Sequence, residues 1–156
     1  MVDTANQLFW LSSEHLYRHS SDHAAVGHKS VIFDQAIPVG NAVMTDVLIR
    51  LWLLTAVIAY YRQAEQLLER SHHAVFHHFP SAASLLNAGV FFHHPLKITT
   101  GKSLDHAVRR LALTDFVLQQ HQRDDAILCH GQQCFAPAQT EQEFNDCFKR
   151  HWRQEK

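Results

Sequence analysis

The sequence contains few of the residues that build common cofactor and redox sites. Its 156 residues include 3 cysteines, 5 glycines and 4 prolines. The glycines form no phosphate-binding loop, and the cysteines form no Cys-x-x-Cys pair. An odd number of cysteines in a chain without an export signal predicts reduced thiols and no disulfide framework. We therefore expect no cofactor.

Charge of one sign and long hydrophobic runs are also scarce. The formal net charge is −1, so the chain has no broad basic field that would attract phosphates. The longest apolar stretch, residues 51–61, is about half the length needed to span a bilayer. Residues 1–10 lack the basic start and apolar run of a signal peptide. These features predict a cytoplasmic protein that binds neither nucleic acid nor membrane.

The composition is that of one globular domain. Hydrophobic residues make up 46% of the chain and charged residues 19%, which argues against long disorder. The length is usual for one domain, and no repeat or linker divides the sequence, so we expect a single domain over residues 1–156. The 14 histidines should make the net charge unusually sensitive to mild acid.

Helical periodicity dominates the middle of the chain. Apolar residues at spacings of three and four, together with the turn residues before Asn41 and at Pro80, predict successive helices with short joints. Short joints favour antiparallel helical hairpins. Residues 1–37 are expected to form a loop with a short strand or hairpin. The predicted helices are residues 42–55, 59–79, 81–92, 104–119 and 141–152, and the predicted short strands are residues 96–101 and 126–131.

Three stretches together resemble one protein family. They are residues 29–41, read as Lys-Ser-Val-Ile-Phe-Asp-Gln-Ala-Ile-Pro-Val-Gly-Asn, residues 96–101, which end in glycine, and the Cys-His-Gly-Gln-Gln-Cys-Phe-Ala-Pro run of residues 129–137. Their order and spacing are similar to those of the spermatogenesis-associated, thioredoxin-domain-containing proteins. The resemblance implies the last part of an α/α toroid, similar to the folds of N-acylglucosamine epimerase and six-hairpin glycosidases. The thioredoxin domain of that family is absent. The expected fold is therefore mainly α, with antiparallel helical hairpins forming part of a toroid and a small β element.

The loop from Lys29 to Asn41 is the best candidate ligand site. Pocket residues of an α/α toroid lie on loops and helix starts, where the first backbone amides favour an anionic or hydroxyl-rich ligand. Asp34 could act as an acid or base, and Asn41 could orient a substrate hydroxyl. In the alternative interpretation, Asp34 and Asn41 only organise the turn and cap the helix that follows.

Other polar groups offer weaker candidates. The pairs His73 with His77 and His15 with His19 have the helical spacing that could clamp a transition metal, but we expect surface histidines and no metal site. The adjacent acids Asp124 and Asp125 are expected to face solvent.

The cysteines leave several alternatives open. Cys129 and Cys134 could form a reversible disulfide or half of a zinc site, or pack as small apolar residues. The four residues between them fit a hairpin turn. Cys147 lies in the last predicted helix.

Two functions remain open, and no catalytic residue can be named. A partial toroid would leave apolar helix faces uncovered, which favours a non-catalytic interaction module that binds a second copy or a separate chain completing the toroid. The alternative is a carbohydrate-active or sugar-binding fragment, with a sugar bound near Lys29, Asp34 and Asn41. The sequence alone does not decide whether the chain is an enzyme.

Overall fold

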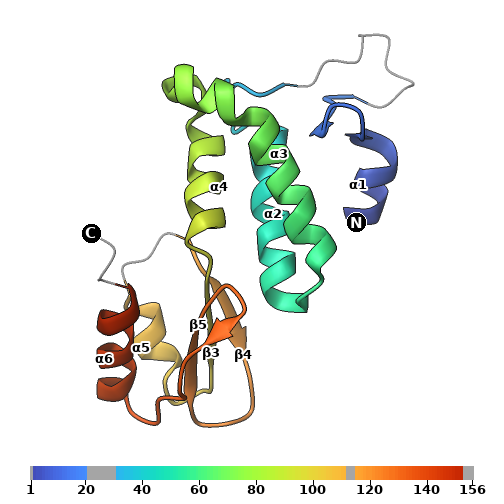
Figure 1. The fold of residues 1–156 in the computed structure, drawn as a ribbon. Coiled ribbons are helices and arrows are strands. Elements are labelled where there is room, and N and C mark those ends of the chain that lie inside the picture. Colours follow the sequence, from blue (N-terminus) through green and yellow to red (C-terminus); the bar gives the residue numbers. More distant parts are fainter. Residues whose placement is uncertain (1, 21–30, 112–114, 153–156) are drawn as a thin grey trace. The chain divides into compact units, whose positions relative to one another are not determined.

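The fold consists of two compact units (Figure 1). The computed structural model describes residues 2–20, 31–111 and 115–152. One unit comprises Met1–Trp52 and Val57–His93, and the other comprises Leu53–Ala56 and His94–Lys156. None of the helices in the described residues is long and apolar enough to cross a membrane. The first unit consists of helices and a short hairpin, and the second consists of a four-stranded sheet with two helices.

The first unit begins with a short helix and a hairpin. Helix α1 (Val2–Phe9) leads into β1 (Trp10–Leu11), which pairs antiparallel with β2 (Leu16–Tyr17). The expected hairpin within residues 1–37 is therefore confirmed, whereas α1 was not expected. Helix α1 has only eight residues and none of them is buried, so its sequence is too short to show a clear helical period of apolar residues.

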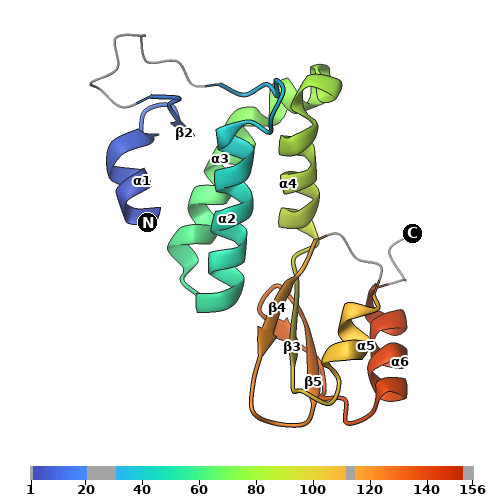
Figure 2. The ribbon, with the colours of Figure 1, turned by 180° about the vertical axis from the view of Figure 1, so that it is seen from behind.

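Three further α-helices complete this unit (Figure 2). They are α2 (Gly40–Thr55), α3 (Ile58–His77) and α4 (Ala83–His93), and the short 3-10 helix η1 (Phe79–Ala82) precedes α4. Aromatic rings join the three helices, since Tyr61 lies 4.8 Å from both Trp52 and Phe92, centroid to centroid. The predicted helices at residues 42–55, 59–79 and 81–92 are confirmed to within a few residues at each end.

The second unit is a small sheet covered by helices. Its strands have the order β4-β3-β5-β6, where β3–β4 is a parallel pair and the other pairs are antiparallel. Helix α5 (Asp105–Arg109) lies between the parallel strands in the sequence, as a βαβ connection requires. The remaining bounds are β3 (Leu96–Thr100), β4 (Val117–Gln120), β5 (Ala126–His130), β6 (Gln133–Cys134) and α6 (Glu141–Trp152).

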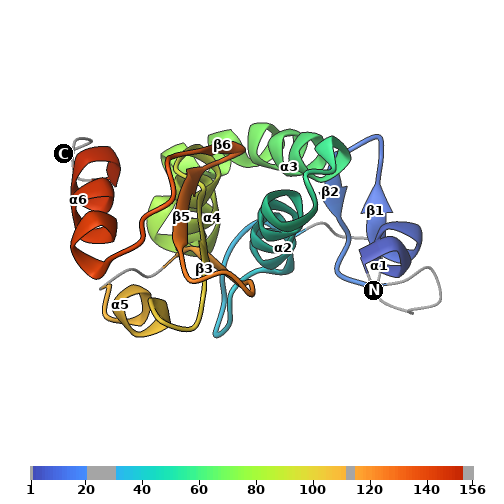
Figure 3. The same cartoon turned by 90° about the horizontal axis from the view of Figure 1, so that it is seen from below.

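Helices α5 and α6 cover the same side of this sheet (Figure 3). The core between them contains Leu96 and Ile98 of β3, Leu128 of β5, Val108 of α5 and Phe144 of α6. Each of these side chains is at most 2% exposed. Since side chains alternate along a strand, the odd-numbered residues of β3 and β5 face the opposite side of the sheet.

The expectation of a mainly helical partial toroid is wrong. The chain is a mixed α/β protein, because its C-terminal unit is organised around a four-stranded sheet and not around helical hairpins. The predicted helix at residues 104–119 ends at Arg109, and Val117–Gln120 instead forms β4. The helical preference of the leucine and glutamines in this segment is overridden by parallel pairing with β3, in the register Lys97↔Val117 to Thr100↔Gln120.

Candidate functional site

The loop before α2 is held by the carboxylate of Asp34. Its Oδ1 accepts a hydrogen bond from the Val39 backbone N–H, at 2.9 Å, and another from the Ser84 hydroxyl. Its Oδ2 accepts from the Ser84 backbone N–H, at 2.8 Å. Ser84 lies in the first turn of α4, where unsatisfied amides favour a negative charge. Asp34 therefore anchors this loop to the start of α4.

These contacts also set the ionisation of Asp34. Burial alone would raise the pKa of this carboxyl group. The hydrogen bonds from the Ser84 hydroxyl, the Ser84 amide and the Val39 amide together outweigh burial and hold the pKa below its ordinary value. Asp34 is thus anionic at neutral pH, with both oxygens engaged.

Asn41 joins the start of α2 to the N-terminal hairpin. Its Oδ1 accepts from the Tyr17 backbone N–H at 2.7 Å, and its Nδ2 donates to the carbonyls of Tyr17 at 3.0 Å and Val31 at 2.8 Å. The residue is 2% exposed. The expectation that its oxygen caps α2 is wrong, because that oxygen pairs with β2 instead.

Of the residues predicted from the sequence, the two that the structure describes have different hydrogen-bond partners. Asp34 contacts α4 and Val39, whereas Asn41 contacts β2 and Val31. Lys29 lies outside the described residues. The observed contacts of Asp34 and Asn41 support a structural role for each, and a ligand role for the loop stays a prediction.

Of the two histidine pairs, one has helical geometry. The rings of His73 and His77 lie 4.3 Å apart, centroid to centroid, on α3. His15 lies in the turn between β1 and β2, with φ of 53°, and its ring stacks on Trp10, so the spacing of His15 and His19 is not that of one helix face. In the described part of the chain, no group of three or more His, Cys, Asp or Glu side chains could hold a metal ion.

The helical unit exposes several large apolar side chains. Helix α4 carries no charged Asp, Glu, Lys or Arg, yet only one side of it is buried. On its other side, Leu86 and Val90 are 39% and 56% exposed. The loop that Asp34 anchors to α4 exposes Phe33 and Ile37, at 42% and 74%. We call Phe33, Ile37, Leu86 and Val90 the apolar face.

The sheet unit contains a buried acid that sequence reasoning placed in solvent. Asp125 is 6% exposed, and its Oδ1 lies 2.8 Å from His121 Nε2 without the alignment of a hydrogen bond. His121 Nδ1 accepts from the Arg123 backbone N–H at 2.9 Å, which places a proton on Nε2, toward Asp125. Both imidazole nitrogens thus face protein groups, so this pair stabilises the β4–β5 loop. The sequence feature that could have indicated the burial of Asp125 is its position directly before the apolar strand β5.

Helix α6 and the segment after β6 form a shallow pocket of about 380 Å³. The rings of Phe135 and His151 stack at 3.8 Å between centroids along one wall. Cys147 also lines the pocket, and burial raises the pKa of its thiol, although nearby Arg150 partly opposes that shift. A thiol in this state is a weak nucleophile at neutral pH.

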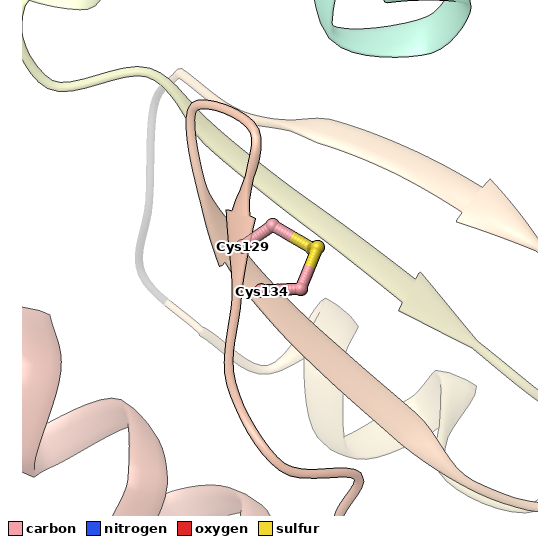
Figure 4. Close-up of a disulfide and its surroundings, with 2 residues drawn as sticks. All are labelled: Cys129 and Cys134. Carbon is pink, nitrogen blue, oxygen red and sulfur yellow. A yellow bond between two sulfur atoms is a disulfide. The ribbon is translucent and has the colours of Figure 1, made fainter.

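Cys129 and Cys134 are joined by a disulfide (Figure 4). The two residues lie directly opposite one another on β5 and β6. Gly131, with φ of 58°, begins the turn between the strands, as expected for a two-residue hairpin turn with glycine in its first position. The default expectation of reduced thiols is therefore wrong for this pair, whereas the hairpin expected between the cysteines is confirmed.

No known protein-family model, curated protein or solved structure matches this chain.

Proposed function

We propose that this chain is a non-catalytic interaction module that associates with a second copy of itself through the apolar face. The observation that carries the proposal is the exposure of Leu86 and Val90 on a helix that has no charged Asp, Glu, Lys or Arg. Asn87 is the polar residue between them, but a helix of this largely apolar composition is normally buried on most sides. Large exposed apolar surfaces on soluble proteins mark interaction sites.

A second copy fits this surface because a two-fold interface places the same apolar patch of each subunit against the other. Leu86 and Val90 lie one turn apart on α4, so two such helices related by a two-fold axis pair equivalent apolar residues. Phe33 and Ile37 widen the surface beyond a single helix stripe. That width matters because a stable interface buries more than about 1,000 Å² in total.

The carbohydrate-binding alternative draws no support from the geometry. Both carboxylate oxygens of Asp34 accept hydrogen bonds from the protein, and Asn41 is 2% exposed. A sugar hydroxyl bound at Asp34 would have to share an oxygen that already accepts a hydrogen bond from the protein.

Light scattering coupled to chromatography, with sedimentation equilibrium, tests the proposal. The wild-type chain is expected to form a dimer, and Leu86→Glu with Val90→Glu should weaken it by at least about tenfold, since two buried charges would face an apolar partner. Leu8→Glu is the matched control, because Leu8 is 45% exposed on α1 and outside the apolar face. Circular dichroism checks that all variants are folded.

A wild-type chain that stays monomeric over the accessible concentration range would refute the proposal. Equal weakening by Leu8→Glu and by the double variant would also refute it, because the apolar face would then have no special role. If a sugar raised the melting midpoint and Asp34→Ala abolished that rise, the carbohydrate-binding alternative would take its place.

A further inference from the structure

The two cysteines of the disulfide lie in different environments. Cys129 is 1% exposed in the middle of the sheet unit. Cys134 is exposed, as is its neighbour Gln133, on the two-residue edge strand β6. A thiol from solvent therefore reaches the sulfur of Cys134 more easily than that of Cys129. This asymmetry gives thiol–disulfide exchange a defined direction.

The strand register places a lysine beside the buried sulfur. Lys97 of β3 lies directly opposite Cys129 of β5, and Cys134 lies opposite Cys129 on its other side. Directly opposite residues of antiparallel strands have their side chains on the same face, with Cβ atoms about 5 Å apart. The Lys97 side chain is therefore next to Cys129. Leu128 faces the α5 and α6 core, so Cys129, Cys134 and Lys97 lie on the sheet face away from that core.

We propose that the Cys129–Cys134 disulfide is a site of reversible exchange with a dithiol, in which Cys134 is the sulfur attacked and Lys97 stabilises the leaving thiolate of Cys129. A positive charge close to a sulfur favours the thiolate form, and a better leaving group speeds exchange. Lys97 is a positioning residue in this proposal, since it acts through Cys129.

The exchange proceeds in two balanced steps. The thiolate of the dithiol attacks Cys134 Sγ, so a mixed disulfide forms, the Cys129–Cys134 bond breaks, and the electron pair leaves on Cys129 Sγ. The second thiolate of the dithiol then attacks the reagent sulfur of the mixed disulfide and releases Cys134 as a thiolate. The dithiol becomes a disulfide, and the protein gains two electrons and, from solvent, two protons.

Reduction of this disulfide removes one covalent link between β5 and the segment that lines one wall of the pocket. Besides the disulfide, β6 is joined to β5 by their antiparallel pairing, and the residues after β6 are joined to β5 by the hydrogen bond from Phe135 N to Leu128 O and by the bridge between Ala126 and Ala138. Phe135 and Ala138 also line the pocket with α6. Reduction should therefore loosen this wall while the Ala126–Ala138 bridge still holds its far end.

The first test locates the attacked sulfur. The folded chain carrying Cys147→Ser is treated with glutathione, quenched with acid, and mapped by peptide mass spectrometry. We expect the glutathione adduct on Cys134. An adduct mainly on Cys129, equal labelling of both cysteines, or a disulfide that resists reduction until the chain unfolds in urea would overturn the proposal.

The second test measures the role of Lys97. In the same Cys147→Ser background, the rate of reduction by dithiothreitol is expected to fall about threefold or more in Lys97→Met. Lys102→Met is the matched control, because Lys102 is exposed two residues beyond the end of β3 and has no place in the register beside Cys129. Its rate should equal that of the parent.

A Lys97→Met rate equal to that of the parent would remove Lys97 from the proposal, and a Lys102→Met rate reduced to the same extent would show only a general effect of charge. Melting curves of the oxidised variants separate either result from loss of fold. Hydrogen exchange of residues 131–138, which should rise on reduction, reports the pocket wall independently of the rates.

Discussion

The two units differ in how completely they cover their apolar side chains. In the sheet unit, α5 and α6 lie over one face, and Leu96, Ile98 and Phe144 are at most 1% exposed. In the helical unit, Val90 on α4 and Phe76 on α3 are 56% and 74% exposed. A helix buries its apolar residues only where another layer lies against it. The difference shows that the helices of the first unit leave apolar side chains exposed, which is the observation on which the proposed association rests.

The largest effect we expect is at Phe144, which compares directly with Phe76. Phe144→Ala should lower the free energy of unfolding by about 3–5 kcal/mol, because it removes a 1% exposed ring from the sheet core. Phe76→Ala removes the same ring from an exposed position and should change this free energy by no more than about 0.5 kcal/mol. Urea unfolding measures both values, and hydrogen exchange assigns each to its unit.

Equal losses for the two phenylalanine variants would contradict the comparison. A large loss at Phe76 alone would mean that the helical unit covers that ring in solution. A dimer that buries Phe76 would produce such a loss in a concentration-dependent way, so the measurement is repeated at two protein concentrations.

Two glycines should give effects of opposite sign. A Cβ atom on Gly101 would lie 1.9 Å from the Arg123 carbonyl oxygen, so Gly101→Ala must displace the β4–β5 loop and should cost roughly 2 kcal/mol or more. A Cβ atom on Gly89 would meet only Leu68 Cδ2 at 3.8 Å, and Gly89→Ala within α4 should stabilise by about 0.5–1 kcal/mol. Thermal and urea unfolding measure both changes. A stabilising Gly101→Ala would show that the loop yields easily.

Local pattern was sufficient for the elements with one clear period. Spacings of three and four located α2, α3, α4 and α6, and short runs bounded by turns located β3 and β5. The helix predicted at residues 104–119 is wrong in its second half. The residues of this segment fit a helical period, but its end pairs with β3, which lies earlier in the chain. A pairing of this kind is a tertiary effect that no local window contains.

The candidate site shows the same limit. Turn preference identified Asp34 as a residue that organises its loop, whereas the helix cap expected of Asn41 is wrong, and both side chains have partners that are distant in the sequence. Ser84 is 50 residues from Asp34, and Tyr17 is 24 residues from Asn41. Asp125 was missed for a related reason, because the loop that buries it packs against Gly101, which follows a different strand. Composition and spacing carry no information about such contacts.

The smallest predicted effect tests the link between the exposed loop and α4. Asp34→Asn removes the charge that accepts two hydrogen bonds from Ser84 at the start of α4 and one from Val39, and should cost about 1 kcal/mol at neutral pH. Asp124→Asn, an exposed change in the sheet unit, should stay within about 0.5 kcal/mol. Urea unfolding of both variants and the wild type gives these values.

The pH dependence separates the charge of Asp34 from its shape. Because the folded pKa of Asp34 lies below its ordinary value of 3.8, its contribution to stability is fully present above that value and is lost as the pH falls through the folded pKa. The difference between wild type and Asp34→Asn should therefore shrink below about pH 4. A difference that stays constant from pH 7 to pH 3 would assign the effect to packing. In that case the anchor of the apolar face would depend on side-chain shape, and acid near pH 3 would leave the proposed dimer interface in place.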